Sequence, residues 1–268
     1  MNPIFKYRIP HRFFYMDHSH GIYQKQGRLF RLKFGENMNT EILSLNTGNI
    51  IDKISYHIHI ISRLLRKGVH HLIRIDENQY AFIYNKKLCI TDGHQIRFDV
   101  SFPGSRPLSF EKIGDELVFG EYRSNPERSP VSVYSINLKN NSKFQVKYTF
   151  ENIRHIHGVY QDPYTLSIYI TTGDENHEAA IWKTNDNFNT IEKVLSGSQQ
   201  TRTIKLLFDE NFIYFGSDAP HEKNYLYKLN KQSYEVTQLI EVGSSVFHGC
   251  KVDNWLFFST AIEPSRIN

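Results

Sequence analysis

The feature that most restricts the fold of this sequence is a pattern of turns and short apolar runs, repeated five times. Each copy has an apolar lead-in, a turn that contains Asp, and a second apolar run rich in Tyr, Phe and Ile. The copies are 74–85, 112–122, 160–174, 207–218 and 251–263, with turn residues Asp76, Asp115, Asp162, Asp209 and Asp253. Apolar runs that flank a tight turn indicate a β-hairpin, so the sequence predicts five similar hairpins.

Two further runs follow each of the first four hairpins. The third runs are 87–93, 130–138, 179–186 and 224–231, and the fourth runs are 95–102, 144–150, 191–197 and 234–242. Four short antiparallel strands in a repeat of about 37 to 48 residues are typical of a β-propeller blade. We therefore expect an all-β fold, a β-propeller of four-stranded antiparallel blades with about five to six blades visible.

The N-terminal residues 1–68 follow the pattern less regularly. Runs at 12–17, 27–35 and 40–45 fit the later strands of an earlier blade, and 51–68 fits a helix or a strand. The last repeat ends after its second strand, so either the N-terminal strands complete it or the chain is a shortened form of a longer propeller. We expect one domain over 1–268. Its blades are expected at approximately 69–102, 106–150, 152–197, 200–242 and, in part, 244–268.

Composition narrows the choice of partners. The net charge of +4 is spread along the chain without a run of five Lys or Arg, which favours an ordinary solvated surface over nucleic-acid binding. No apolar stretch approaches 18 residues, and the N-terminus has no apolar leader region, so we expect neither a membrane partner nor secretion. A cytoplasmic location is the default expectation. Cys89 and Cys250 lie in apolar runs and are expected to be buried free thiols.

Three arginines stand at equivalent positions, at the start of the innermost strand of successive repeats. They are Arg106, Arg154 and Arg202, spaced by 48 residues each. Loops of successive blades converge at the mouth of the central channel, where guanidinium groups provide bidentate donors for carboxylate, sulfate or phosphate. The alternative is that each Arg pairs with an acid of a neighbouring blade.

An acid follows the second strand of four consecutive repeats, on the face expected to carry the arginines. These acids are Glu121, Asp174, Asp218 and Glu263, and the loop after the first of them adds Arg123. Paired carboxylates beside arginines suit an acidic sugar and can act as acid and base, or as nucleophile and acid. The alternative is that they form salt bridges that hold the blades in register.

Histidines are frequent, and three His-x-His pairs occur, at 18/20, 57/59 and 155/157. On a strand, side chains two residues apart point the same way, so each pair could chelate one metal ion. His248 aligns with His157 and could add a contact from another blade. Metal-binding, catalytic and structural roles all remain open. We assign no metal ligand and expect no cofactor, with a divalent metal held by the His pairs as the alternative.

The segment "TNDNFNTI" at 184–191 resembles the Asp-box of bacterial-neuraminidase (BNR) repeats. Thr184, Asp186 and Thr190 match the motif, while Phe188 replaces its Gly and Ile191 its Trp. The stretch 106–265 thus resembles a sialidase-superfamily-like propeller. The resemblance implies a saccharide ligand, and implies that Arg106, Arg154 and Arg202 correspond to the three arginines that hold the substrate carboxylate in sialidases.

The function expected from these features is binding of, or action on, an acidic saccharide, including sialidase-like glycoside hydrolysis. The expected catalytic residues are His155, His157, Asp174, Asp218 and Glu121, and the expected substrate-binding residues are Arg106, Arg123, Arg154, Arg202, His248 and Glu263. One alternative is a non-catalytic propeller that binds a protein partner. Another is a His-dependent, metal-assisted polysaccharide lyase. An enzyme should show a deep pocket with paired titratable groups, and a platform a flat face with exposed aromatics.

Overall fold

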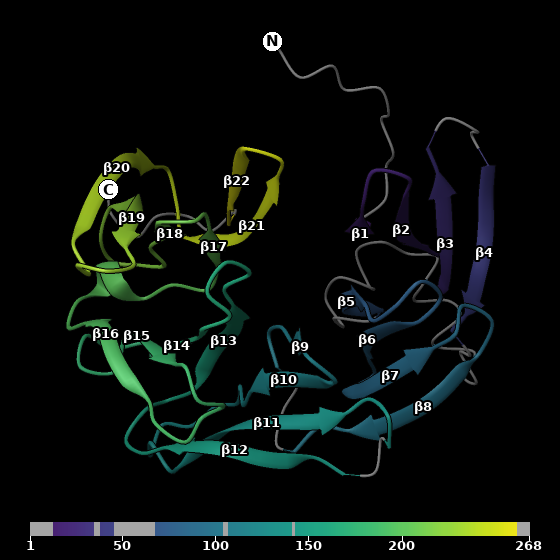
Figure 1. The fold of residues 1–268 in the computed structure, drawn as a ribbon, viewed down its shortest axis with the longest axis horizontal. Helices are drawn as coiled ribbons and strands as arrows, with labels where there is room; N and C mark the ends of the chain where they lie inside the picture. The colour runs from purple at the N-terminus through teal and green to yellow at the C-terminus, as the bar shows by residue number, and fades with distance from the viewer. Residues whose placement is uncertain (1–12, 35–37, 46–67, 104–106, 141–142, 262–268) are drawn as a thin grey trace. The chain divides into compact units, whose positions relative to one another are not determined.

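The computed structural model describes residues 13–34, 38–45, 68–103, 107–140 and 143–261 (Figure 1). The chain divides into two compact units, residues 1–102 and 103–268. Across both, the described residues form five four-stranded sheets and one two-stranded sheet, and every strand pair is antiparallel. The predicted all-β fold is confirmed. The division into blades of one domain stays a prediction.

The first unit contains two sheets. The first consists of β1 (Phe13–Met16), β2 (His20–Lys25), β3 (Arg28–Lys33) and β4 (Met38–Ser44); the second consists of β5 (Val69–Arg74), β6 (Tyr80–Tyr84), β7 (Lys87–Thr91) and β8 (Ile96–Ser101). The N-terminal runs therefore build a four-stranded sheet of their own. Most of the ambiguous segment 51–68, with the 57/59 His pair, lies outside the described residues.

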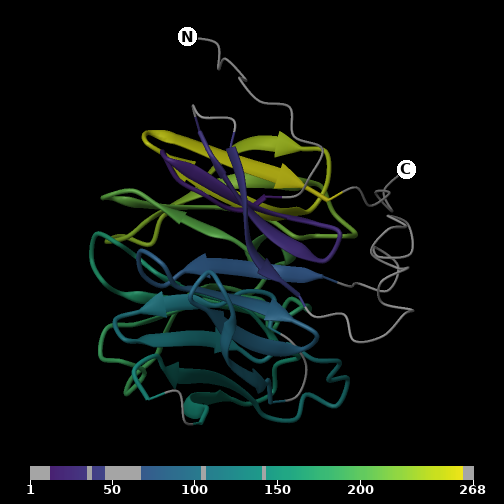
Figure 2. The same ribbon diagram turned by 90° about the vertical axis from the view of Figure 1, so that its right-hand side faces the viewer.

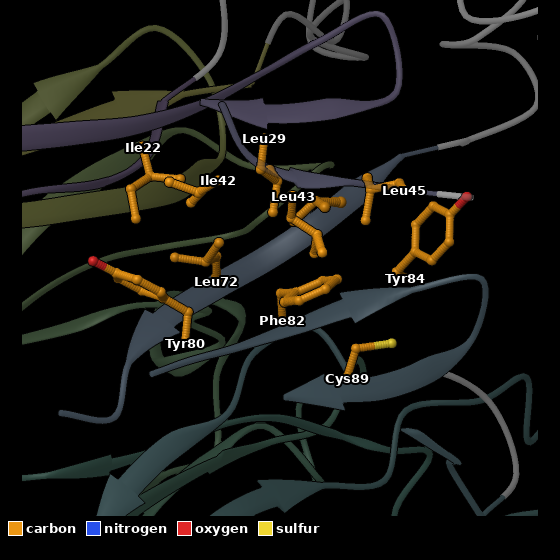
Figure 3. Packing of buried hydrophobic residues seen from close by; sticks show 11 residues of the cluster. Ile22, Leu29, Ile42, Leu43, Leu45, Leu72, Tyr80, Phe82, Tyr84 and Cys89 are labelled. Carbon is orange, nitrogen blue, oxygen red and sulfur yellow. The ribbon is translucent and has the colours of Figure 1, made fainter. Parts of the chain in front are cut away.

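The core of this unit lies between its two sheets, which Figure 2 shows as separate layers, purple and blue. Figure 3 shows side chains of both sheets pointing toward one another, among them Ile22 and Leu29 from the first and Leu72 and Phe82 from the second. Cys89 belongs to this cluster, and burial raises the pKa of its thiol to about 12. It is the buried free thiol that was predicted.

The second unit contains three four-stranded sheets and a two-stranded one. They are β9 (Glu111–Ile113), β10 (Glu116–Gly120), β11 (Val131–Asn137) and β12 (Gln145–Phe150); β13 (Ile156–Gln161), β14 (Ile168–Thr172), β15 (Ala180–Thr184) and β16 (Glu192–Ser196); β17 (Leu206–Phe208), β18 (Phe212–Gly216), β19 (Asn224–Asn230) and β20 (Val236–Val242); and β21 (Val246–Val252) with β22 (Trp255–Thr260). A short 3₁₀ helix, η1 (Gln199–Thr201), precedes β17.

Cys250, on β21, is exposed, so its predicted burial was wrong. An apolar sequence context does not show which face of a strand is covered.

Among the repeated aspartates, Asp76, Asp162 and Asp209 accept hydrogen bonds from turn amides through their side chains. Oδ1 of Asp76 accepts hydrogen bonds from the amides of Asn78 and Gln79, both at 2.9 Å. Oδ1 of Asp209 accepts from the amides of Asn211 at 2.8 Å and Phe212 at 2.6 Å. An Asp side chain that satisfies turn amides in this way favours the turn, which accounts for the recurrence of Asp at these three hairpins.

Successive sheets of the second unit are joined where one second strand ends and the next inner strand begins. The amide of Ile156 donates to the carbonyl of Glu121 at 3.0 Å, and the amide of Val246 donates to Ser217 at 3.0 Å. Gly120 and Gly216 end the two second strands, and a Cβ on either would overlap with the side chain of Ile156 or Val246. The small residue permits the close approach that places the start of β13 beside the loop after β10.

The Asp-box-like segment forms a compact turn between β15 and β16. Asp186 accepts hydrogen bonds from Thr184 Oγ1 at 2.9 Å, and from the amide and hydroxyl of Thr190 at 2.9 and 2.7 Å. Phe188, which replaces the Gly of the motif, has φ of +71° and is buried in the core beside Ile170. The three matching residues therefore make the turn, and the departure from the motif places an aromatic side chain in the core.

Candidate functional site

The start of β13 carries two buried imidazoles whose orientation is fixed by main-chain carbonyl groups. His155 and His157 are 6% and 2% exposed. His155 Nδ1 lies 3.3 Å from the carbonyl oxygen of Arg123, and His157 Nδ1 lies 3.2 Å from that of Thr203. A carbonyl oxygen only accepts hydrogen bonds, so each Nδ1 carries the proton and donates it. The loops of the preceding and following sheets therefore hold the two rings with Nε2 turned toward the same place.

Asp174 lies where those two nitrogen atoms point. It follows β14, the neighbour of β13, and its Oδ1 lies 3.2 Å from His155 Nε2 and 3.3 Å from His157 Nε2. The two Nε2 atoms are 3.1 Å apart. Tyr122 covers the outer ring, with its centroid 4.2 Å from that of His155. The two histidines and the acid singled out from the sequence thus form one cluster.

Two arginines from successive repeats surround the same carboxylate. Arg202 Nη2 lies 3.2 Å from Asp174 Oδ1 and 3.1 Å from Asp218 Oδ2, so it bridges the acids of two repeats. Arg154 Nη1 lies 3.5 Å from Asp174 Oδ2. Gln199, from η1, donates to the carbonyl oxygen of Asp174 at 2.8 Å.

The surroundings shift the pKa values of Asp174 and Asp218 in opposite directions. Burial alone would raise the pKa of Asp174, but its close contacts with His155 and His157 and the charge of Arg202 lower it well below its usual range. Burial raises the pKa of Asp218, an effect that Arg202 and a hydrogen bond from Ser245 oppose without cancelling. One acid is thus held ionised while its neighbour retains its proton to a higher pH.

A cavity of about 450 Å³ opens beside this cluster. Its lining consists of Arg154, Asp174, Glu175, Asn176, His177, Gln199, Arg202, Pro220 and His221. These residues come from the loops that follow β14 and β18 and from the segments that lead into β13 and β17. It is a polar cavity of the size that small ligands occupy.

The structure brings together six of the expected site residues: Arg154, His155, His157, Asp174, Arg202 and Asp218. Two others form a pair outside the cavity lining. Glu121 Oε1 accepts from Arg123 Nε at 2.7 Å, and Arg123 also donates to Asn125, Ser129 and Pro130. They brace the loop after β10, whose carbonyl orients His155. His248 is exposed on β21. Arg106 and Glu263 lie outside the described residues.

Sequence reasoning missed Gln199 and Glu178. Gln199 lies in a 3₁₀ turn that has no distinctive signal. Glu178, whose side chain is fully buried, pairs with Arg128 at 3.2 Å and accepts a hydrogen bond from the amide of Arg154. It fixes the backbone just before the histidines. The position of Glu178 shortly after the turn at Gly173–Asp174 was the only signal for it in the sequence. That position did not distinguish Glu178 from an acid on the surface.

The antiparallel four-stranded repeats define the class of this protein as a β-propeller. No protein-family model and no curated protein sequence matches the chain. The resemblance to Asp-box propellers therefore rests on the residues of 184–191. The described part of the chain contains no helix long and apolar enough to cross a membrane.

Solved structures of β-propellers match most of the chain. One is a gluconolactonase from Xanthomonas campestris, with 12% identity, 90% of this chain and 79% of that one covered, and a TM-score of 0.56. An oligogalacturonate lyase from Vibrio parahaemolyticus has 11% identity, coverages of 93% and 75%, and a TM-score of 0.55. The WD40 propeller domain of Doa1 has 7% identity, coverages of 89% and 72%, and a TM-score of 0.58. Identities this low show the fold alone.

Proposed function

We propose that this propeller binds an acidic saccharide in the cavity beside Asp174. The observation that carries the proposal is that two guanidinium groups, from equivalent positions of successive repeats, line one polar cavity of about 450 Å³. Guanidinium groups match the geometry of a sugar carboxylate, and the amides and imidazoles of the lining suit hydroxyl groups.

The two arginines have different parts in this proposal. Arg202 is 18% exposed and bridges two acids, so it mainly positions the site. Arg154 is 35% exposed, and its contact with Asp174 is long at 3.5 Å. Its guanidinium is therefore the group that would hold the anionic part of the ligand. This geometry refines the expectation that both arginines bind the ligand directly.

A catalytic role is the second candidate, because Arg202 bridges two neighbouring acidic side chains, Asp174 and Asp218, at the site. The pKa of Asp218 is raised and that of Asp174 is lowered, so Asp218 is the more readily protonated of the two, which suits a division into acid and ionised partner. That division fits sialidase-like hydrolysis or a lyase reaction on an acidic sugar. A gluconolactonase and an oligogalacturonate lyase among the matched structures illustrate that the fold can support carbohydrate chemistry.

The test is calorimetric titration of the protein with oligogalacturonate, with sialyllactose and with their neutral counterparts. We expect binding of an acidic sugar, and a loss of at least tenfold in affinity in Arg154→Gln. Arg28→Gln is the matched control, because this arginine lies on β3 of the first unit, is exposed and does not belong to the cavity lining. Equal affinity in wild type and Arg154→Gln, or no preference for acidic over neutral sugars, would contradict the proposal.

Turnover is measured separately on the sugars that bind. Release of new reducing ends or of unsaturated sugars by wild type, lost in Asp218→Asn, supports the catalytic candidate. Binding without turnover leaves a binding module. Binding of neither sugar class directs attention to a protein partner instead.

A further inference from the structure

Three acceptor atoms, two of them on buried imidazoles, converge at the centre of the candidate site. They are Nε2 of His155, Nε2 of His157 and Oδ1 of Asp174, separated by 3.1, 3.2 and 3.3 Å. The carbonyl contacts place the ring protons on Nδ1, so in the neutral rings both Nε2 atoms present lone pairs. A carboxylate oxygen also presents lone pairs. Three lone-pair donors at these distances repel one another unless a cation lies between them.

The distances fit a metal ion of ordinary size. With metal–ligand bonds of about 2.1 Å, neighbouring ligands are about 3.0 Å apart in octahedral and about 3.4 Å apart in tetrahedral geometry. All three measured separations fall inside this interval. Two imidazoles and one carboxylate form a donor set used by divalent first-row transition metals.

The groups that contact the far side of each imidazole are arranged as in a metal site. A ligating histidine typically donates its other N–H to a carbonyl or carboxylate, which fixes the ring and its tautomer. Both rings make such a contact, one to Arg123 and one to Thr203. We propose that His155, His157 and Asp174 bind a divalent transition-metal ion, such as Zn²⁺, through Nε2, Nε2 and Oδ1.

The neighbouring arginines are compatible with this ion. Arg202 Nε and Nη2 both lie 3.1 Å from Asp218 Oδ2, so it retains a carboxylate partner when Asp174 Oδ1 binds a metal. Arg154 contacts the other oxygen of Asp174, Oδ2. Asp174 also belongs to the cavity lining, so an ion can enter from there. The metal proposal does not depend on which ligand the cavity takes.

A proton on one imidazole is the competing explanation, because it too would place a positive charge between the three atoms. The test is therefore direct. Untagged protein is stripped with a chelator, dialysed and titrated with Zn²⁺ by calorimetry, and bound metal is counted by elemental analysis. We expect one tightly bound Zn²⁺ per chain, and a rise in Tm on its addition.

The variants locate the ion. Asp174→Asn and His157→Gln should each lower Zn²⁺ affinity at least a hundredfold, whereas the exposed-residue control His94→Gln should bind as wild type does. Circular dichroism checks folding. If His157→Gln does not fold, Asp174→Asn and the visible spectrum of the Co²⁺-loaded wild type, which reports nitrogen and oxygen ligation, carry the test. Absence of stoichiometric binding in wild type, or equal binding in wild type and Asp174→Asn, would overturn the proposal.

Discussion

At the residue scale, one non-glycine residue adopts a backbone conformation that normally favours glycine, and burial of its side chain compensates for the strain. Phe188 has φ of +71°, a conformation that favours Gly, and its ring is 4% exposed in the core of the second unit. Non-glycine residues with such φ values carry a strain of about 1 kcal/mol or more. Burial of the aromatic ring offsets that cost, because it contributes about 1.5 to 3 kcal/mol.

Phe188→Gly should therefore be more stable than Phe188→Ala, which is the reverse of the order that ordinary helix or strand propensities predict. Both variants lose the ring, and we expect both to lower the free energy of unfolding by about 3 kcal/mol or more. The Gly variant should be the more stable of the two by about 1 kcal/mol, because it alone relieves the φ strain. Urea unfolding measures this. An Ala variant as stable as the Gly variant would contradict the strain argument.

Glu111, on β9, should make stability depend on pH. Burial raises its pKa to about 7, an effect that Lys205 opposes without cancelling. The Glu111 carboxyl group therefore keeps its proton in the folded state at a pH where it has already released it in the unfolded chain. The protonated Glu111 side chain contributes its full stabilisation below about pH 4.5. This stabilisation, on the order of 2 kcal/mol, is lost as the pH rises through about 7.

Glu111→Gln removes this titration. Relative to wild type, the variant should become more stable as pH rises from 5 to 8, whereas the exposed Glu127→Gln should keep a constant offset. Urea unfolding at several pH values is the measurement. A pH-independent difference between Glu111→Gln and wild type would show that the carboxyl group is not perturbed.

At the element scale, glycine at the end of the second strand sets how closely the next inner strand approaches. A Cβ at Gly120 would overlap with Ile156, the residue between the two site histidines, whereas a Cβ at Gly243 would meet no atom within 4 Å. The strand end therefore affects both packing and the position of the imidazoles.

Gly120→Ala should lower the free energy of unfolding by about 1 to 3 kcal/mol, the usual cost of overpacking, and should also weaken ligand binding in the cavity. Gly243→Ala, the control, should leave both nearly unchanged. Thermal unfolding and calorimetric titration measure the two effects. Equal stability of the two Ala variants would mean that β13 moves away without cost.

The strands were predictable because hairpin signals are local. Asp76 and Asp209 cap their own turns within three residues, so each hairpin can be recognised without its neighbours. The N-terminal sheet was recognised only in part, although Asp17 caps its first hairpin by accepting hydrogen bonds from the amides of Ser19 and His20. The burial of Glu178 and the exposure of Cys250 depend on neighbouring segments, so the sequence did not distinguish either residue from others of its type.

At the scale of the whole molecule, the repeat explains why part of the site was predictable. Equivalent positions of successive repeats converge, so aligning the repeats identified Arg154, Arg202, Asp174 and Asp218 together. What the alignment did not give was the pairing between them, because Arg202 contacts acids of two repeats. The solved propellers matched to this chain include a gluconolactonase and an oligogalacturonate lyase, so the fold does not identify a ligand.

The most direct test of the proposed binding site is a crystal structure of the protein with an oligogalacturonate that binds in solution. We expect the sugar to occupy the cavity lined by Arg154, Gln199 and His221, with a carboxylate within hydrogen-bond distance of the Arg154 guanidinium. A sugar bound elsewhere on the molecule, or in the cavity with its carboxylate away from Arg154, would contradict it.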